Sequence, residues 1–490
     1  MKYRQFCLAA LLLLLLAGCS PGPAAPQEDV PPLLPPEPPD LEERQAEFLA
    51  FLAEVNGARA ALYNDPDPVP FDESWAPDLS ELEGQFTERE MEAFLQEPEH
   101  GARSVSAAEA AEDVETFFQL LKHAYGAYDY FGGDQVFLPI RDSILAALPE
   151  EGEVSPAQLE ELLADPLSPV LVDGHLRIGG TAMRDVHDQC MYYVPNLWFD
   201  DASGLDPELV KPTVDREGRI RLGLAALASP YDTIGLPLTL EIEGEDVSLW
   251  WKCCAPAATD YSAAFSESTL ADGTPLLTAM AMHADTETGK EQLERMSSCG
   301  GEYADVPVLV WDLRGNRGGS DIYINRWFYG CTGQWPPIRD VVAQKRSPLA
   351  MYAILRGGFS SGVEMPASPQ WEISGSGGDY LEREGITLVL QDKNTASSGE
   401  TAVKNMHTLK NSLFLGSNTM GCSLCPNNFP FYLPHSGLLL YMGTGLWLVN
   451  EGENIDGVGF LPDLWVPPGE ALRAAERLIS YYGLNNLPSQ

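Results

Sequence analysis

The chain has 490 residues, of which 72 are acidic and 30 are basic, and its formal net charge at pH 7 is −42. The acidic excess is spread along the sequence, which argues against nucleic acid or an anionic lipid surface as the binding partner. The length allows a large hydrophobic core and about two or three domains.

The first residues have the pattern of an export signal. Two basic residues precede an apolar run over residues 6–17, which is too short to span a bilayer as a mature helix. The run ends in Leu16-Ala-Gly-Cys19, which resembles the lipobox of bacterial lipoproteins. The resemblance implies lipidation of Cys19, so we expect a lipoprotein signal over residues 1–18 and a membrane anchor on the extracytoplasmic side. An ordinary signal peptide cleaved nearby is the alternative.

A proline-rich segment follows the signal. Residues 20–40 contain nine prolines and little that could build a core. We expect residues 19–44 to form an extended tether between the lipid anchor and the folded part of the chain.

The next part of the chain has the pattern of a helical subdomain, which we place over residues 45–165. Ser106-Ala-Ala-Glu109 has the spacing of a capping box and is followed by apolar residues on one helical face. Ser155-Pro-Ala-Gln158 repeats this spacing, with proline at the first helical position. These segments predict a helical bundle or cap.

Residues 166–288 have the signals of a mostly β segment. Residues 238–243 and 247–251 are strand-like and flank Gly244-Glu-Asp246, which predicts a β-hairpin. No feature of this segment clearly indicates a loop that would bind a peptide tail.

Helices and strands alternate after residue 288, which predicts an α/β core over residues 289–475 and a C-terminal tail over residues 476–490. The strongest strand signals are the apolar runs 306–311 and 386–390. Each run is followed by a polar, glycine-containing segment, and these two segments carry the candidate chemistry.

The first of these segments is Asp312-Leu-Arg-Gly-Asn-Arg-Gly-Gly319. Its glycines let backbone N–H groups approach a ligand closely. The segment lacks the Gly-Lys-Ser/Thr of a phosphate-binding loop and the Gly-x-Gly-x-x-Gly spacing of a dinucleotide site. Taken alone, it is more typical of a tight turn that ends a buried strand.

The second segment is Thr395-Ala-Ser-Ser-Gly-Glu400, between a strand and an expected helix. A serine at such a turn lies where free backbone N–H groups point, and these groups can stabilise an oxyanion beside a hydroxyl nucleophile. Ser397 and Glu400 also have capping-box spacing, so by itself the segment is better explained as a helix start.

The order of these motifs resembles that of the tail-specific, or carboxyl-terminal processing, serine peptidases and of the related tricorn core protease. Two further matches, Val172-Asp-Gly-His-Leu176 and Asp456-Gly-Val-Gly-Phe-Leu-Pro-Asp463, lie in family order on either side. The resemblance covers about residues 106–467. It implies a crotonase-like (Clp-protease-like) α/β core of ββα units that needs no metal, nucleotide or other cofactor.

The resemblance assigns the nucleophile to Ser397, three positions before Glu400. The processing branch has a lysine general base at a position that corresponds to Cys422 here, and Lys404 and Lys410 are out of register. A neutral thiol is a poor general base for a serine, so we expect no serine–lysine dyad.

The tricorn-like branch instead uses a histidine base oriented by a distant carboxylate. His175 corresponds to that histidine, and Asp456 lies where relatives carry glutamate, with Glu453 as the nearby rival. A carboxylate there would hold the imidazole tautomer and stabilise the imidazolium. The serine that precedes the histidine in that branch is replaced by Gly174.

The resemblance also implies an oxyanion hole made of two backbone N–H groups. They are assigned to Gly318 in the glycine loop, with Gly319 as the alternative, and to Ser398 after the nucleophile. Glycine suits this role because nothing hinders the approach of the substrate oxygen.

Nine cysteines are present, including one in the signal and Cys19. Seven remain in the body, so some can pair outside the cytoplasm while at least one stays free or pairs between chains. For Cys422-Ser-Leu-Cys425 we expect a structural pair or a short-loop disulfide and no zinc, because no histidine follows at ligand spacing. The neighbouring Cys253 and Cys254 have no assigned role.

Together these observations predict a lipid-anchored, exported serine peptidase that acts on peptide or protein substrates, with Ser397 as nucleophile and His175 as general base. Two alternatives remain. The departures at Cys422, Gly174 and Asp456 favour a non-catalytic surface protein that kept the peptide-binding cleft. A hydrolase of non-peptide esters would use the same residues.

Overall fold

The computed structural model describes residues 40–487 except 66, 68, 100, 231–237, 243–244, 338, 358–364, 376–379 and 450–451. The predicted signal peptide, Cys19 and most of the predicted tether lie outside the described residues. Among the residues that are described, no helix is both long enough and apolar enough to cross a membrane.

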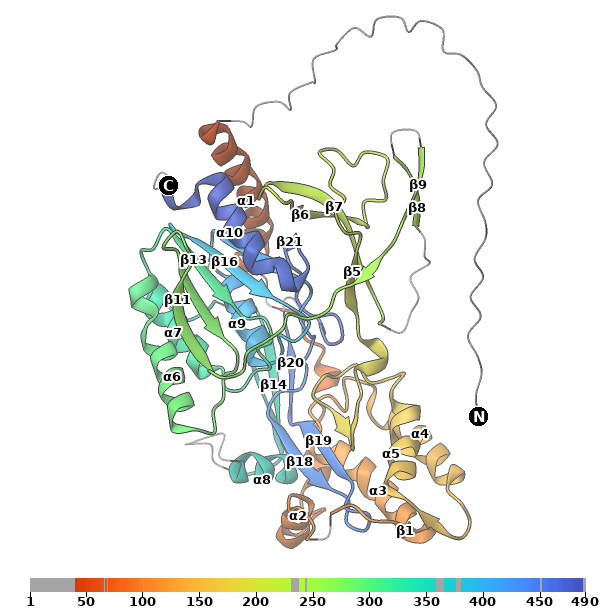
Figure 1. Ribbon diagram of the computed structural model, residues 1–490. Coiled ribbons are helices and arrows are strands. Elements are labelled where there is room, and N and C mark those ends of the chain that lie inside the picture. The colour runs from red at the N-terminus through yellow and green to blue at the C-terminus, as the bar shows by residue number, and fades with distance from the viewer. Residues whose placement is uncertain are drawn as a thin grey trace, which may run out of the picture. The chain divides into compact units, whose positions relative to one another are not determined.

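The centre of the fold is a six-stranded sheet (Figure 1). Its strands, in spatial order, are β11 (Phe265–Thr269), β12 (Pro275–Ala279), β13 (Val308–Asp312), β16 (Ile386–Gln391), β17 (Ser412–Gly416) and β21 (Leu464–Trp465). β11 is antiparallel to β12, and the other neighbours are parallel. Every residue of β13, β16 and β17 is buried, as expected for parallel strands that are covered on both faces.

Five helices cover the two faces of this sheet: α1 (Leu41–Tyr63), α6 (Glu287–Ser298), α7 (Ile322–Thr332), α9 (Ser398–His407) and α10 (Ala471–Tyr482). Alternate residues of a strand point to opposite faces. Leu309 and Trp311 of β13 therefore pack with α6, α7 and α9, whereas Val308 and Val310 pack with α1 and α10. This layering confirms the predicted α/β fold.

The sheet and its helices extend beyond the predicted core at both ends. β11 and β12 precede residue 289 and pair directly with the core strands. At the other end, α10 runs into the segment 476–490, where Leu478 and Ile479 are buried against the sheet. The apolar stripe of α10 thus belongs to the core and not to a separate tail.

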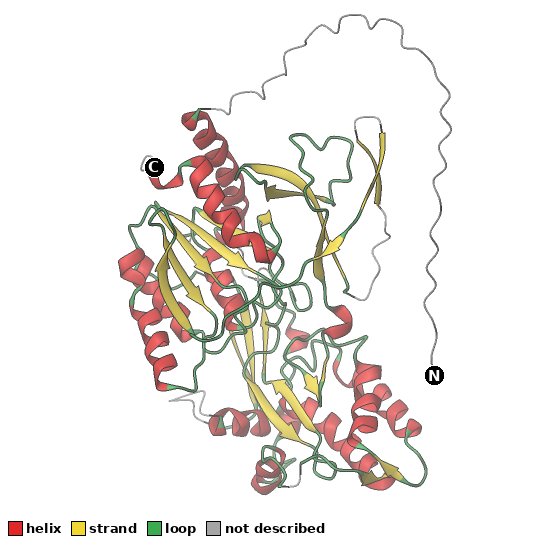
Figure 2. Ribbon diagram, in the orientation of Figure 1, coloured by secondary structure: helices red, strands yellow, loops and turns green. Residues whose placement is uncertain are grey.

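A helical N-terminal region shares one hydrophobic core with two smaller sheets (Figure 2). Its helices are α2 (Glu88–Phe94), α3 (Ala107–Ala124), α4 (Gly133–Ala147), α5 (Pro156–Leu167) and, from later in the chain, α8 (Pro348–Arg356). The sheets are β18 (Asn428–Tyr432), β19 (Leu439–Gly443), β3 (Arg177–Ile178) and β4 (Thr181–Ala182), and β15 (Gln370–Gly375), β14 (Val341–Arg346) and β20 (Gly445–Leu448).

Local sequence explains where two of these helices begin. The predicted capping boxes open α3 and α5, because Ser106 exchanges hydrogen bonds with Glu109 and Ser155 does so with Gln158. The short strands β1 (Val105–Ser106) and β2 (Glu153–Val154) pair just before these helices and fix their starts relative to each other.

A third sheet comes from the middle of the chain, in the order β10 (Lys252–Cys253), β5 (Cys190–Tyr193), β7 (Ile220–Ala228) and β6 (Val210–Val214). The predicted hairpin is present as β8 (Leu238–Ile242) and β9 (Glu245–Leu249), and its second strand begins two residues earlier than predicted. The Thr213 hydroxyl donates to the backbone oxygen of Trp465 (2.7 Å), and the Ile220 N–H donates to the Tyr482 hydroxyl (3.0 Å). This third sheet therefore packs on β21 and α10.

Candidate active site

The loops that follow the parallel strands meet at one edge of the central sheet. β13 ends at Asp312 and β16 ends at Gln391, and the two motif segments follow these ends directly. The Ala396 N–H donates to the backbone oxygen of Asn316 at 2.8 Å. The glycine loop and the serine turn are thus joined by a hydrogen bond, and each holds the other in place.

Ser397 occupies a strained turn between β16 and α9. Its φ of 53° and ψ of −121° lie outside the regions that residues with a side chain favour. The serine hydroxyl makes no hydrogen bond that caps α9, and the Glu400 N–H donates to the Ser397 backbone oxygen at 2.7 Å. The turn therefore leaves the Ser397 Oγ available for contact from another segment.

His175 makes that contact. Its Nε2 lies 3.3 Å from the Ser397 Oγ, although 222 positions separate the two residues in sequence. The loop that carries His175 lies between α5 and β3 and is fixed by the buried Asp173. The Asp173 carboxylate accepts the N–H of His175 (2.7 Å) and of Leu176 (3.2 Å) and the hydroxyl of Tyr125 (2.7 Å).

Burial sets the protonation state of the imidazole. It lowers the pKa of His175 below its ordinary value of 6.5, and the negative charges of Asp173 and Glu400 oppose this shift without cancelling it. At neutral pH the ring is therefore uncharged, and Nε2 is able to accept a proton from the serine hydroxyl.

The other ring nitrogen has no carboxylate beside it. The Nδ1 of His175 is buried and lacks a hydrogen-bond partner among the described residues. Glu453, the rival to Asp456, is exposed, and its backbone pairs with Val449. A direct acceptor for Nδ1 is therefore missing from the described geometry, which sets this site apart from a complete serine–histidine–acid triad.

Asp456 is buried behind the histidine loop, and its oxygens point at backbone. Oδ2 accepts the N–H of Gly174 at 2.7 Å. Oδ1 accepts the N–H of Ser423 at 2.7 Å and of Leu424 at 3.1 Å. The prediction that this carboxylate holds the imidazole is corrected by this geometry. Because its oxygens are occupied by backbone donors, Asp456 positions the loop before His175 and does not bind the ring.

Glu400 is a buried anchor for the loop after β17. Its Oε1 accepts the Thr419 hydroxyl (2.6 Å) and the Gly421 N–H (2.7 Å). Its Oε2 accepts the N–H of Cys422 (2.8 Å) and of Ser397 (3.2 Å). Glu400 thus ties the serine turn to its neighbouring loop, a role that its capping-box spacing indicates only in part.

The predicted oxyanion donors are close to the nucleophile, but one of them is already engaged. The Gly318 N–H donates to the Asn316 Oδ1 at 2.9 Å, so the assignment of this N–H to the oxyanion hole is corrected. Gly319, the alternative, lines the same cleft as Ser397 and Ser398, and neither its N–H nor that of Ser398 has a hydrogen-bond acceptor among the described residues.

Both glycines of this loop are required by close approach. A Cβ on Gly318 would lie 2.7 Å from the Ser397 Cβ, and a Cβ on Gly319 would lie 2.2 Å from the Met282 carbonyl carbon. Their φ values of 95° and 142° are also in the region that favours glycine. The loop can therefore reach the serine only without side chains at these positions.

No lysine reaches the serine within the described geometry. Cys422 is buried at the position where the processing branch has its lysine, and burial raises the pKa of its thiol well above the ordinary value. A Cβ on Gly174 would lie 2.8 Å from the Cys422 Sγ, which explains the glycine there. Lys404 is buried in an ion pair with Asp340, and Lys410 forms an ion pair at the surface.

One cleft of about 900 Å³ brings the site together. It is lined by His175, Gly319, Ser397 and Ser398. Within the described ranges, no group of three or more histidine, cysteine or acidic side chains could hold a metal ion.

The cysteines of the described residues are free thiols. Cys422 and Cys425 are both buried. Among the other cysteines, Cys253 is exposed and Cys190 is buried beside it.

The fold and the site define a serine hydrolase built on an α/β sheet. Residues 277–466 match the model of peptidase family S41. These matched residues are therefore a peptidase S41 domain of the tail-specific protease superfamily, and the domain supports a serine-type peptidase. The matched segment contains Ser397, Gly318 and Asp456 but not His175, which comes from the helical region.

The chain is also similar to solved structures, at TM-scores below 0.5. Mature CPAF is 12% identical over 78% of this chain and 98% of that chain, with a TM-score of 0.43. A putative peptidase from Parabacteroides merdae ATCC 43184 is 13% identical over 78% and 98%, with a TM-score of 0.41. The photosystem II D1 C-terminal processing protease is 14% identical over 74% and 93%, with a TM-score of 0.36. No curated protein matches the chain.

Proposed function

We propose that this peptidase cleaves peptide bonds through an acyl-enzyme on Ser397, with His175 as the general base. The observation that carries the proposal is the 3.3 Å separation between the His175 Nε2 and the Ser397 Oγ. The lowered pKa of His175 supports it, because a base must be unprotonated before it can activate a hydroxyl.

In the first half of the reaction, the Ser397 Oγ attacks the peptide carbonyl while its proton passes to the His175 Nε2. The oxyanion accepts hydrogen bonds from the N–H groups of Gly319 and Ser398. His175 then gives its proton to the leaving amine, and the acyl-enzyme remains. In the second half, water attacks the acyl group while His175 again acts as the base. The carboxylate product is released, and the free serine is restored.

The imidazolium formed in each half needs stabilisation, since the Nδ1 has no direct acceptor among the described residues. Asp173 and Glu400 are buried carboxylates whose charges favour the protonated ring. We assign to them the electrostatic part of the role that an acid plays in a complete triad. Their carboxylates also hold the histidine loop and the serine turn, so the same groups provide geometry and charge.

We also propose that the protein is exported and anchored to a membrane through a lipid on Cys19. Support comes from the order of charge, apolar run and small residues that ends at Cys19. Growth of the producing cells with an alkyne-tagged fatty acid tests this point. We expect labelled wild-type protein and no label on Cys19→Ala, and equal labelling of both proteins would refute the anchor.

The Nδ1 of His175 has no hydrogen-bond partner among the described residues, and this favours a second candidate function. This candidate is a surface protein of the same fold that binds peptides but does not cleave them. The two candidates share the cleft and differ in chemistry. A hydrolase of non-peptide esters would use the same serine and histidine, so it differs in substrate only.

Hydrolysis of a mixed peptide library tests the proposed function. We expect Ser397→Ala and His175→Gln to lose about 10³-fold or more of the wild-type kcat/KM. Ser320→Ala is the matched control, because Ser320 lines the cleft but has no role in the mechanism. Undiminished turnover by folded Ser397→Ala would refute the nucleophile. A wild-type protein that binds peptides but never cleaves them would support the second candidate.

A further inference from the structure

Two cysteines from neighbouring strands bring their thiols close together in the third sheet, although Cys253 lies opposite Tyr192 in the strand register. Cys190 begins β5, Cys253 ends β10, and these strands pair in antiparallel fashion. The two Sγ atoms lie 3.5 Å apart. Cys190 is buried, whereas Cys253 is exposed and can be reached by a reagent from solution.

We propose that Cys190 and Cys253 form a disulfide that joins β5 to β10. An S–S bond is about 2.05 Å long, so the two sulfurs need to move together by a small side-chain adjustment. The strands that carry them are already hydrogen-bonded, and no change of pairing is required. This inference does not depend on the peptidase chemistry.

The pairing is selective because the neighbouring cysteine lies on the other face of the sheet. Successive residues of a strand point to opposite faces. Cys190 belongs to a cluster with Leu224 and Trp251, whereas Cys254 packs in a separate cluster with Trp465. Cys254 is therefore turned away from Cys190, and Cys253 is the partner.

The bond forms by two thiol–disulfide exchanges with a disulfide-bearing oxidant such as oxidised glutathione. The Cys253 thiolate attacks one sulfur of the oxidant, and the other sulfur leaves as a thiolate. The Cys190 thiolate then attacks the Cys253 sulfur and releases the second glutathione thiolate. In total, two protons and two electrons leave the protein. Burial raises the pKa of Cys190 to about 12, which makes the second exchange the slower one.

The cross-link would hold a segment that supports the serine turn. After β10, the Ala257 N–H donates to the Asp392 Oδ2 at 2.9 Å, and the Tyr261 hydroxyl donates to the backbone oxygen of Gly315 at 3.2 Å. Asp392 directly follows β16, and Gly315 belongs to the glycine loop. Fixing β10 therefore restricts a segment that contacts both catalytic loops.

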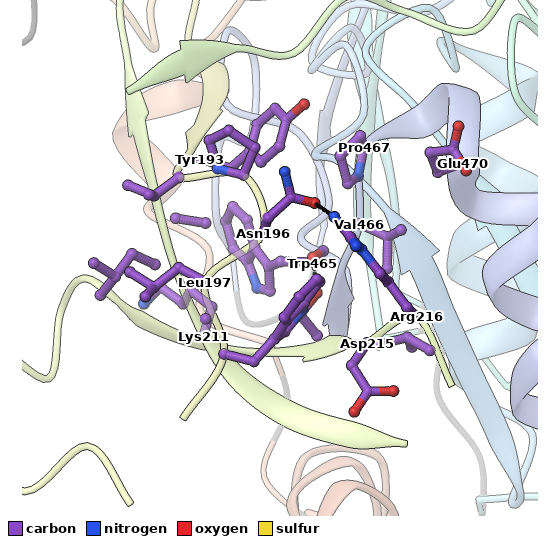
Figure 3. A pocket seen from close by; sticks show the side chains of 18 of the residues that line it. Tyr193, Asn196, Leu197, Lys211, Asp215, Arg216, Trp465, Val466, Pro467 and Glu470 are labelled. Atoms are coloured by element: carbon purple, nitrogen blue, oxygen red, sulfur yellow. Dashed lines mark hydrogen bonds between the residues drawn. The ribbon is translucent and has the colours of Figure 1, made fainter. Parts of the chain in front are cut away.

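The residue before β5 contacts the loops that follow β17 and β20. The Gln189 N–H donates to the backbone oxygen of Gly457 (2.9 Å), and the Asn418 Nδ2 donates to the Gln189 oxygen (2.9 Å). Further along, Tyr193 of β5 lines a second cavity of about 400 Å³ (Figure 3). Its neighbour Lys252 of β10 lines the same cavity. The disulfide would thus also fix the wall of this cavity.

Peptide mapping after oxidation tests the pairing. The full chain is incubated with oxidised glutathione, and free thiols are then alkylated under denaturing conditions. We expect one linked peptide that contains Cys190 and Cys253, in wild type and in Cys254→Ser, and its loss in Cys190→Ser and Cys253→Ser. A linked peptide that contains Cys254, or full alkylation of Cys190 and Cys253 in oxidised wild type, would overturn the proposal. The peptide map of the oxidised wild-type protein decides whether the disulfide forms, even if a variant does not fold.

Hydrogen exchange tests the proposed consequence. In the oxidised protein we expect backbone exchange over residues 255–261 to slow by several-fold, and the melting temperature to rise by on the order of 5 °C. Cys190→Ser treated with the same oxidant is the control and should show neither change. A disulfide that forms without slower exchange over residues 255–261 would refute the link to the catalytic loops.

Discussion

Replacing Asp456 by asparagine tests whether a buried acid holds the loop before His175. Asparagine keeps the shape of the side chain and the oxygen that accepts the N–H groups of Ser423 and Leu424. Its NH₂ group would face the Gly174 N–H, however, so the bond that Oδ2 accepts from Gly174 is lost. Leaving a buried N–H without an acceptor costs about 1–3 kcal/mol.

The pH dependence of the free energy of unfolding separates the cost of the lost hydrogen bond from the cost of burying the Asp456 charge. Burial, together with the charge of Asp173, raises the pKa of Asp456 from 3.8 to about 7, so the native state binds the proton more tightly than the unfolded state. The resulting stabilisation is fully present below pH 3.8 and is lost as the pH rises through 7. The shift corresponds to about 4 kcal/mol, of which about 3 kcal/mol is lost between pH 5 and pH 8.

Urea unfolding of Asp456→Asn and wild type at pH 5 and pH 8 measures this effect. We expect the difference in the free energy of unfolding to move by about 3 kcal/mol in favour of the variant as the pH rises, because only wild type loses the bound proton. Glu453→Gln, which removes a nearby exposed carboxylate, is the matched control. A difference that stays constant, or that moves against the variant, would refute the assignment of a titrating acid behind the histidine loop.

Three further substitutions test other parts of the site. His175→Gln should lower kcat/KM by about 10³-fold or more. Since burial lowers the pKa of His175, the wild-type pH–rate profile should begin to fall only below pH 6.5, and a fall that starts above pH 7 would contradict this. Gly319→Ala should lower kcat by about 10²-fold or more, because its Cβ would displace the loop from Met282. Steady-state kinetics measure this, and an unchanged kcat of the folded variant would contradict the prediction. Glu400→Gln should lower the free energy of unfolding by about 2–4 kcal/mol, because its amide would face backbone N–H donors, and urea unfolding with no loss would disprove the anchoring role.

The parts of the fold that could be predicted depend on residues close together in sequence. The run 386–390 is apolar throughout and forms the fully buried β16. The serines that open α3 and α5 are separated from their capping partners by three positions, so spacing alone identified them. In contrast, the pairing of β11 and β12 with the core sheet depends on tertiary packing, and their own sequence did not indicate it.

The same distinction explains the candidate site. The order of the motifs predicted that Asp456 and Gly318 lie near the nucleophile. Their hydrogen bonds, however, are made with Gly174 and Asn316. The direction of such a bond is fixed by how separate segments pack, and a motif does not contain that information. The distance between His175 and Ser397, 222 positions apart, likewise could not follow from local pattern. Only the resemblance to a peptidase family indicated it.

The most direct test of Ser397 as nucleophile is to map the site that a fluorophosphonate probe modifies. Such a probe reacts with an activated serine hydroxyl, and mass spectrometry of the digested protein identifies the modified residue. We predict a single adduct on Ser397, much slower labelling of His175→Gln, and wild-type labelling of Ser320→Ala. An adduct on Ser398 or elsewhere, or a folded wild-type protein that the probe does not label, would contradict the account.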